Sequence, residues 1–367
     1  MAVIKNKGFA LWFTGLPCSG KTTLADQVSR RLSELGHQVE HLDGDVIRKN
    51  LSSDLGFSKD HRKINLERAA FVASLLTKNG VATLVSFVSP YREMRDSARK
   101  QIGSFVEVFV NCPLEVCEKR DVKGMYKLAR QGKITEFTGV SDPYEKPLSP
   151  EVTVHTDRMD MEECVKKILH FLNSRELLLP QNPFPRDPAL TKAFHLAAYH
   201  HRGQERKGGL PYIVHPVSVA RMLKEAGCGK EIVAAALLHD TLEDTGCEVE
   251  EITREAGKRV AKIVCEITDK DKTAPWKARK KNYLAGLKKA SRPALCVSCA
   301  DKADNVASLL VGYKSSGPEF FKAFSGKIRP KYLNYKNIYD VIKKRYPSCP
   351  VLPVFHAKLE EMKSLFK

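Results

Sequence analysis

The sequence of 367 residues has no apolar run that approaches the roughly 18 residues of a membrane-spanning helix. Its N-terminal residues, 1–5, open on no long apolar segment, so we expect no signal peptide, no contact with a membrane and a cytoplasmic location. Internal repeats and low-complexity tracts are also missing. The ten cysteines are scattered through a large, lysine-rich chain, which predicts reduced thiols and not a disulfide framework.

Acidic residues are too few to balance the basic ones, since 61 Lys and Arg stand against 43 Asp and Glu. The imbalance lies mostly in residues 181–367, which hold 34 basic and 20 acidic residues, compared with 27 and 23 in residues 1–180. A basic half predicts an anionic partner such as a nucleotide. The basic clusters at 277–281 and 288–289 come with no recognisable nucleic-acid-binding motif, so we interpret them as a solvated surface and do not expect nucleic acid as a partner.

Two domains are expected, joined where four prolines fall within residues 180–188. Before this point, strand-like runs at 9–14, 38–42, 81–85 and 105–110 alternate with helical segments such as 22–35, which is typical of an α/β domain with a parallel sheet between helices. After it, helical periodicity at 189–199, 216–226, 231–239, 249–268 and 277–289 predicts an all-α domain. We therefore expect an α/β domain at 1–178, a linker at 179–188 and an all-α domain at 189–367.

A phosphate-binding motif follows the first predicted strand. The segment from Gly15 to Thr22 fits G-x-x-x-x-G-K-[ST] and opens a predicted helix, which is the context of a P-loop. Backbone N–H groups and the helix N-terminus would bind phosphate there. Lys21 is expected to reach the β- and γ-phosphates during catalysis, and Thr22 to hold the Mg²⁺ of MgATP.

Further sequence motifs in the first half indicate which molecule accepts the phosphoryl group. In order they are Leu42-Asp43-Gly44-Asp45, Ser86-Phe87-Val88-Ser89-Pro90-Tyr91-Arg92, the segment 117–130 and Phe137-Thr138-Gly139-Val140. With the P-loop, this series resembles the adenylyl-sulfate (APS) kinase family over about residues 5–175. The resemblance implies a P-loop kinase that transfers the γ-phosphate of ATP to the 3′-hydroxyl of adenosine 5′-phosphosulfate and gives PAPS, as in sulfate assimilation.

The same resemblance implies roles for individual residues. Asp43 is the expected catalytic carboxylate, Phe57 and Phe137 sandwich the adenine of APS, and Lys123 and Lys127 belong to a closing lid. Ser89 is expected to contact substrate or stabilise the fold, and Glu67, where the family commonly has arginine, to weaken anion binding. The implied ATP-binding set is Gly15, Leu16, Pro17, Cys18, Ser19, Gly20, Lys21, Thr22, Thr23 and Arg120. The implied APS-binding set is Asp43, Asp45, Arg48, Phe57, Arg62, Asn65, Ser89, Lys123 and Phe137.

The second half contains a histidine–aspartate constellation. His239 and Asp240 close an apolar predicted helix, His215 lies one helix earlier, and Asp301 lies in a later one. Two imidazoles and two carboxylates without thiolates suit Mn²⁺ or a similar divalent ion. Glu243 and Asp244 lie one turn beyond the pair and are expected to position or deprotonate the attacking water.

Other histidines and cysteines of the second half receive plainer interpretations. His195 and His200 belong to no motif and are interpreted as core residues. Cys296 and Cys299 form an isolated C-x-x-C in an apolar run and are interpreted as buried structural cysteines.

The histidine and aspartate blocks resemble the hydrolase domain of the RelA/SpoT family, within the HD phosphohydrolases, over about residues 188–365. The resemblance implies Mn²⁺ bound by His215, His239, Asp240 and Asp301, and removal of the 3′-pyrophosphate of guanosine 3′,5′-bis(diphosphate), (p)ppGpp. Glu243 and Asp244 would be the catalytic pair. The implied second-substrate residues are Arg206, Lys207, Lys272 and Asn305, with Arg329 and Tyr332 as weaker candidates.

The sequence thus predicts a bifunctional enzyme, but its second substrate stays open. Because the first half installs a 3′-phosphate on adenosine, the second could instead remove the 3′- or 2′-phosphate of PAPS, 3′-phosphoadenosine 5′-phosphate or NADPH. It could also be a non-catalytic nucleotide sensor that regulates the kinase. The complete set of candidate ligands and acids favours a second active site. We expect small nucleotides as partners and a homo-oligomeric assembly.

Overall fold

The computed structural model describes residues 8–180, 182–206, 209–269, 273, 275–317 and 328–365. These residues form two compact units, which are considered separately. The sheet unit contains residues 8–180 together with 205, 206 and 209–211. The helical unit contains residues 182–204 and the described residues from Tyr212 onwards.

The sheet unit is built on five parallel strands in the order β2-β3-β1-β4-β5. They are β1 (Phe9–Thr14), β2 (Val39–Asp43), β3 (Ala82–Ser86), β4 (Phe105–Asn111) and β5 (Val152–His155). Every residue of β1 is buried, as a central parallel strand requires. The predicted α/β class is confirmed. The short β5 was absent from the expected strands, because four residues just after a proline carry little signal.

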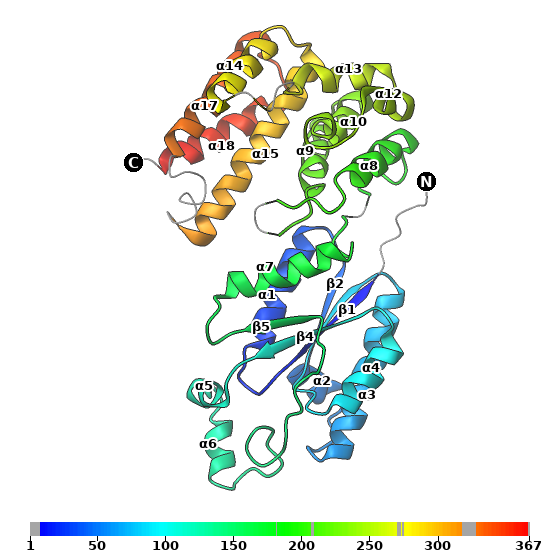
Figure 1. Cartoon of the computed structure of the whole chain (residues 1–367), viewed down its shortest axis with the longest axis vertical. Helices are drawn as coiled ribbons and strands as arrows, with labels where there is room; N and C mark the ends of the chain where they lie inside the picture. The colour runs from blue at the N-terminus through cyan, green and yellow to red at the C-terminus, as the bar shows by residue number, and fades with distance from the viewer. Residues whose placement is uncertain are drawn as a thin grey trace. The chain divides into compact units, whose positions relative to one another are not determined.

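Helices cover both faces of this sheet (Figure 1). The helices of the unit are α1 (Lys21–Glu34), α2 (Gly44–Asn50), α3 (Lys59–Lys78), α4 (Arg92–Ile102), α5 (Leu114–Arg120), α6 (Met125–Arg130) and α7 (Met161–Ser174). The helices α1 and α7 pack together on one face, and α3 and α4 pack together on the other. A capping box between Asp160 and Glu163 begins α7, which buries Ile168, Leu169 and Leu172.

The helical unit confirms the predicted all-α class. Its described helices are α8 (Pro188–His200), α9 (Val214–Glu225), α10 (Lys230–Leu238), α11 (Thr241–Asp244), α12 (Val249–Ala256), α13 (Lys258–Ile267), α14 (Trp276–Leu287), α15 (Arg292–Ser316), α17 (Ile328–Arg345) and α18 (Leu352–Ser364). The apolar helix α10 lies at the centre and packs against α8, α9, α13 and α15. Its last six residues, 233–238, are all buried, so the residues that follow it are held firmly.

The prediction of one continuous helix over 249–268 is wrong. The chain forms α12 and α13, which meet at Gly257. Gly257 has φ 97° and ψ 156°, a conformation that residues with a Cβ rarely adopt. The hydrophobic periodicity continues through this point, since both helices bury one apolar face, and it therefore conceals the break.

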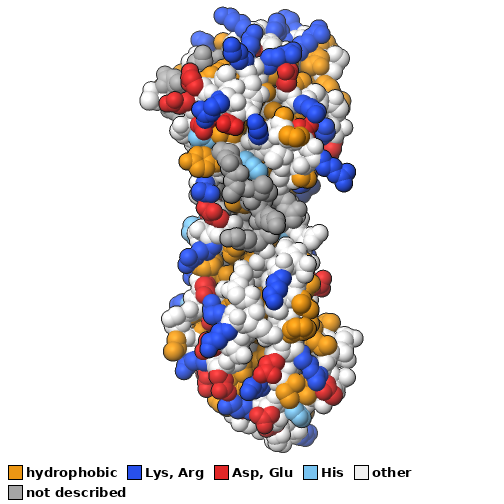
Figure 2. Space-filling view, turned by 90° about the vertical axis from the view of Figure 1, so that its right-hand side faces the viewer, with side chains coloured by type: hydrophobic (Ala, Val, Ile, Leu, Met, Phe, Trp, Pro, Cys, Tyr) orange, Lys and Arg blue, Asp and Glu red, His pale blue; other side chains and the backbone are white. Residues whose placement is uncertain are grey.

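The surface is rich in basic side chains. On the face shown in Figure 2, lysine and arginine gather at the upper end, which belongs to the helical unit. Among the described helices, none combines the length and the apolar character needed to cross a bilayer.

Candidate functional site

The P-loop connects β1 to α1 and has the close packing that its glycines permit. A Cβ at Gly15 would lie 2.5 Å from the carbonyl oxygen of Val110, so only glycine fits there. Gly20 caps α1 with φ 95°, in the region that glycine tolerates best. The turn leaves the N-terminus of a 14-residue helix facing the loop, which is a favourable place for phosphate.

The Lys21 side chain packs against the P-loop, where it is predicted to contact the phosphates of ATP. Its Nζ donates a hydrogen bond to the carbonyl oxygen of Leu16 at 2.7 Å, and the residue is 8% exposed. Burial lowers the pKa of Lys21 to about 8. A phosphate in the loop would restore the charged form of this amine.

The carboxyl ends of β2 and β3 bring Asp43 to the P-loop. Asp43 and Ser86 are paired in the register of these strands, and Ser86 Oγ donates to Asp43 Oδ2 at 3.0 Å. Thr22 Oγ1 donates to the same oxygen at 2.9 Å. Burial opposes ionisation of Asp43, but these hydroxyls and the backbone N–H groups that follow it hold its pKa below the usual range. An ionised carboxylate beside a threonine hydroxyl is a suitable pair for Mg²⁺.

The predicted acceptor residues are partly tied to one another. The Arg48 guanidinium lies 4.3 Å from the centre of the Phe57 ring, which is 55% exposed. Arg62 donates to the carbonyl oxygens of Phe57 and Glu136 and to Thr138 Oγ1. Arg62 is therefore buried as a brace between two loops, whereas the sequence suggested a direct contact with the anion.

Asn65 is buried near this brace, and its Oδ1 has no hydrogen-bond partner among the described residues. Phe137, the second predicted adenine contact, packs edge-on against Tyr126 with the ring centres 5.0 Å apart. Ser89 is buried, and its Oγ accepts a hydrogen bond from Trp12 Nε1 at 3.0 Å. This geometry turns the Ser89 hydroxyl toward the core, which supports a structural role.

The remaining predicted kinase residues lie around the loop. Lys123 forms an ion pair with Asp45, and Lys127 is exposed on α6. Arg120 donates to Thr156, whose hydroxyl donates to the Ser19 carbonyl in the P-loop.

Glu67 is exposed and lines a groove between α3 and α4 with Lys63 and Glu93. This groove is on a different side of α3 from the buried Arg62 and Asn65. An effect of Glu67 on the acceptor site is therefore not expected.

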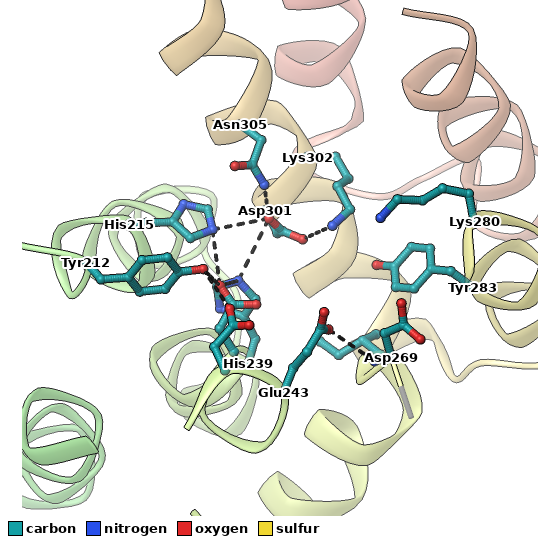
Figure 3. Close-up of a pocket in the computed structure, with 13 residues that line it drawn as sticks. Tyr212, His215, His239, Glu243, Asp269, Lys280, Tyr283, Asp301, Lys302 and Asn305 are labelled. Atoms are coloured by element: carbon teal, nitrogen blue, oxygen red, sulfur yellow. Dashed lines mark hydrogen bonds and ion pairs between the residues drawn. The ribbon is translucent and has the colours of Figure 1, made fainter. Parts of the chain in front are cut away.

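The histidine–aspartate residues of the helical unit converge as predicted (Figure 3). His215 Nε2 lies 3.2 Å from Asp301 Oδ1 and 3.6 Å from Asp240 Oδ2. His239 Nε2 lies 3.1 Å from Asp240 Oδ2 and 3.8 Å from Asp301 Oδ1. Two nitrogens and two oxygens thus alternate around one small space. They come from α9, the end of α10 and α15, which are far apart in the sequence.

The other nitrogen of each imidazole has a partner that fixes the ring. His215 Nδ1 lies 2.6 Å from Asp304 Oδ2, and His239 Nδ1 lies 2.8 Å from the carbonyl oxygen of Ala236. Both contacts favour a proton on Nδ1 and leave the Nε2 lone pair for an ion. Sequence reasoning missed Asp304, although it follows Asp301 by three residues, close to one turn of the same helix.

The arrangement fits a divalent cation. His239 Nε2 is fully enclosed and forms no hydrogen bond within the described residues, so an electron pair points into the shared space. Lys302 and Asn305 contact the two oxygens of Asp301. Burial opposes ionisation of Asp301, but the Lys302 charge and the two histidines hold its pKa well below the usual range. A buried, ionised carboxylate and two oriented imidazoles form a donor set of the kind that Mn²⁺ accepts.

Glu243 stands at the edge of this space, on the opposite side from His215 (Figure 3). Its Oε2 accepts the backbone N–H of Asp269 at 3.1 Å, and Arg279 Nη2 lies 3.3 Å from its Oε1. Burial raises the pKa of Glu243, which suits a general base. Asp244 Oδ2 lies 3.1 Å from the Tyr212 hydroxyl, which also contacts Asp240.

One pocket contains these groups and adds residues that the sequence did not indicate. The additional lining residues are Tyr212, Ile267, Asp269, Lys280, Tyr283 and Lys302. Asn305 lines the pocket as predicted. The predicted Arg206, Arg329 and Tyr332 are described but do not line it, and Lys207 and Lys272 lie outside the described residues. Lys280 and Tyr283 escaped notice because they lie in a helix whose basic surface looked merely solvated.

Comparisons with known proteins agree with this division. A family model described as adenylylsulphate kinase matches residues 7–155, and one described as an HD domain matches residues 193–314. The adenylyl-sulfate kinase of Halothermothrix orenii is 51% identical over 178 residues, which is 48% of this chain and 96% of that protein.

Two solved structures are also similar to the chain. One is the Mycobacterium tuberculosis APS kinase in complex with AMPPNP and APS, at 42% identity and a TM-score of 0.45, covering 46% of this chain and 99% of that one. The other is a metazoan ortholog of SpoT that hydrolyses ppGpp, at 28% identity and a TM-score of 0.40, covering 48% of this chain and 94% of that one.

Proposed function

The chain belongs to the adenylyl-sulfate kinase family and carries, after the kinase, an HD domain of the metal-dependent phosphohydrolases; from this premise we propose a role for the residues of each site and a substrate for the second. Its first activity is the transfer of the ATP γ-phosphate to the 3′-hydroxyl of APS, which gives PAPS. We propose that the HD domain is catalytically active as well and gives the protein a second activity.

In the kinase site, Lys21 would neutralise the charge of the transferring phosphoryl group, and the P-loop backbone would hold the phosphates. Thr22 and Asp43 would hold Mg²⁺, which screens phosphate charge when bound. Phe57 and Phe137 would stack on the adenine of APS. Arg62 would act through Phe57 and the loop at Glu136, because its donors are directed at these groups.

In the second site, His215, His239, Asp240 and Asp301 would hold a divalent ion, for which we propose Mn²⁺. When bound, the ion supplies Lewis-acid chemistry at the phosphoryl group. Glu243 would take the proton of the attacking water, because it lies at the edge of the ligand space with a raised pKa. Tyr212 would keep Asp240 and Asp244 in place through its hydroxyl.

For this site we propose hydrolysis of (p)ppGpp at its 3′-pyrophosphate. The observation that carries the proposal is the convergence of the four donor atoms beside Glu243, in the order of motifs of the RelA/SpoT hydrolases. Two cations, Lys280 and Lys302, line the same pocket. A diphosphate group has enough negative charge to interact with both cations.

The test is to incubate the full chain with Mn²⁺ and, separately, (p)ppGpp, PAPS, 3′-phosphoadenosine 5′-phosphate or NADPH, and to analyse the products by ion-exchange chromatography. Release of pyrophosphate from (p)ppGpp alone is the expected result. Release of orthophosphate from an adenosine nucleotide would replace the proposed substrate. If the intact protein binds nucleotide but cleaves none of the four, the unit is a sensor and not a hydrolase.

The matched control is Asp301→Ala in the full chain, which removes one proposed ligand. PAPS synthesis by the same preparation shows that the rest of the protein is active. Hydrolysis that survives in this variant would come from a contaminating enzyme, and the assignment would fail.

A further inference from the structure

A second group of metal-binding side chains lies outside the nucleotide pocket. His200 is the last residue of α8, Cys247 lies in the turn between α11 and α12, and Glu251 is in the first turn of α12. Each offers one ligand atom, and the three atoms all lie within 4.8 Å of one another. None of the three lines the pocket that contains His215 and His239.

The contacts between these residues are ones that a bound ion would replace. His200 Nε2 lies 2.9 Å from Glu251 Oε2, and the other carboxylate oxygen of Glu251 is 3.9 Å from Arg254. The Cys247 thiol is buried and makes a weak contact to the carbonyl oxygen of Glu248 at 3.7 Å. A histidine–glutamate ion pair alone would not require a thiol beside it, so the cysteine is the informative member of the group.

The chemistry of the three donors selects the metal. Zinc accepts imidazole nitrogen, thiolate sulfur and carboxylate oxygen at about 2.0 to 2.3 Å, usually with four ligands. In a tetrahedron of that size the ligand atoms are about 3.3 to 3.7 Å apart. Small side-chain rotations would bring the three atoms to these separations. Because His200 and Glu251 are only partly buried, a water molecule can reach the fourth position.

We propose that His200, Cys247 and Glu251 form a second divalent-metal site, suited to zinc. Its position gives it a consequence for the hydrolase. The Cys247 N–H donates to Thr245 Oγ1 at 3.1 Å, directly after the segment that carries Glu243 and Asp244. A metal that joins α8 to α12 through Cys247 would hold this turn in place.

Cobalt(II) in place of zinc provides a specific test on the full chain. A thiolate bound to Co²⁺ gives a sulfur-to-metal charge-transfer band in the near ultraviolet. Among the described residues that line the pocket of His215 and His239, none is a cysteine or methionine that could produce one. The band is expected in the unchanged protein and in Asp301→Ala. Cys247→Ser should abolish it, since the serine hydroxyl is a poor ligand at neutral pH.

A different thiol cluster serves as the control. Cys228, Cys296 and Cys349 approach one another, with Sγ–Sγ distances of 3.6 and 3.9 Å. Cys228→Ser should leave the cobalt band unchanged. If the band disappears in Cys228→Ser, or persists in Cys247→Ser, another cysteine supplies the thiolate and the proposal is wrong.

Zinc content gives an independent measurement. After exposure to Zn²⁺ and dialysis, the Asp301→Ala variant is expected to retain one zinc per chain. When His200→Ala or Glu251→Gln is added to Asp301→Ala, the double variant is expected to retain none. Circular dichroism confirms that each variant is folded. If folded Asp301→Ala protein shows neither the cobalt band nor retained zinc, the proposal is overturned. The proposed hydrolase is unaffected by this result, because its activity is measured separately on the unchanged chain.

Discussion

At the scale of single residues, the two sites use buried charges that neighbouring groups hold in one state. Lys21, Asp43 and Asp301 are all removed from water to different extents, and each has a partner that limits its movement. Such groups need little rearrangement when substrate arrives, which is the condition for effective electrostatic catalysis.

Replacing Lys21 by alanine should lower PAPS formation at least ~100-fold, because the transferring phosphoryl group loses a positioned cation. The measurement is a coupled assay with MgATP and APS. Nucleotide hydrolysis by the HD domain, assayed in the same preparation, serves as the control and should be unchanged. Normal PAPS synthesis in Lys21→Ala would contradict the assignment of the P-loop.

Proton uptake should accompany nucleotide binding to the kinase at pH 8. The pKa of Lys21 is lowered to about 8 by burial, so about half of these amines are neutral there in the free protein. Bound phosphate favours the charged amine and raises this pKa, which draws a proton from the buffer. Titration calorimetry in buffers of different ionisation enthalpy measures the uptake. Lys21→Arg, which stays charged, should abolish it.

Glu243→Gln and His239→Ala should differ in metal binding. A carboxamide cannot accept a proton from water, so Glu243→Gln should lower hydrolysis by about 10²- to 10⁴-fold while Mn²⁺ stays bound. His239→Ala removes a proposed ligand, so this variant should lose both bound Mn²⁺ and hydrolysis. Electron paramagnetic resonance of bound Mn²⁺ distinguishes them. Loss of the metal in Glu243→Gln would make Glu243 a ligand, and our division of roles would be incorrect.

At the scale of elements, two of the proposed metal ligands lie where a helix ends, whereas Asp301 lies inside α15. His239 and Asp240 follow the buried helix α10, and the acids of α11 come one short turn later. The strand ends do the same work in the kinase, where β2 and β3 place Asp43 and Ser86 beside the loop after β1. Buried helices and strands thus hold several of the reactive groups at their termini.

The break between α12 and α13 should depend on glycine. Gly257→Ala should destabilise the protein by about 1 to 3 kcal/mol, since a Cβ disfavours the backbone conformation at this position. Apart from its neighbours along the chain, no described atom lies within 4 Å of the new methyl group, so the cost is conformational and not a steric clash. Denaturant unfolding followed by circular dichroism measures it.

Gly286 is the matched control for that substitution. It lies inside α14 with open space around it, and Gly286→Ala should stabilise the protein by up to about 1 kcal/mol. If both variants shift stability in the same direction, the argument from backbone conformation at Gly257 is wrong.

At the scale of the whole molecule, the two candidate sites lie in two compact units. Asp301→Ala in the full chain should abolish hydrolysis and leave PAPS synthesis within about twofold, because the contacts of Asp301 with described side chains are all within the helical unit. Both activities are measured on one preparation. A large fall in PAPS synthesis would show that the second site regulates the first. The proposed domain limits and the homo-oligomer stay predictions.

The candidate side chains of both sites could be predicted from the sequence because they occur in short motifs with fixed spacing along the chain. The P-loop, the adjacent His239 and Asp240, and the pair Glu243 and Asp244 are local patterns, and both the fold class and the family follow from them and the surrounding blocks. The separate roles of Phe57 and Phe137 rest on the family resemblance and not on any local pattern.

Only the tertiary structure decided which distant groups meet. It directed Arg62 toward backbone carbonyls, placed Asp304 behind His215, and brought Lys280 into the pocket. It also joined His200 to Cys247 and Glu251, three residues that no motif connects. Sequence spacing reports neighbours along one helix or strand, whereas these contacts depend on how separate helices and loops pack against one another, which no local pattern encodes.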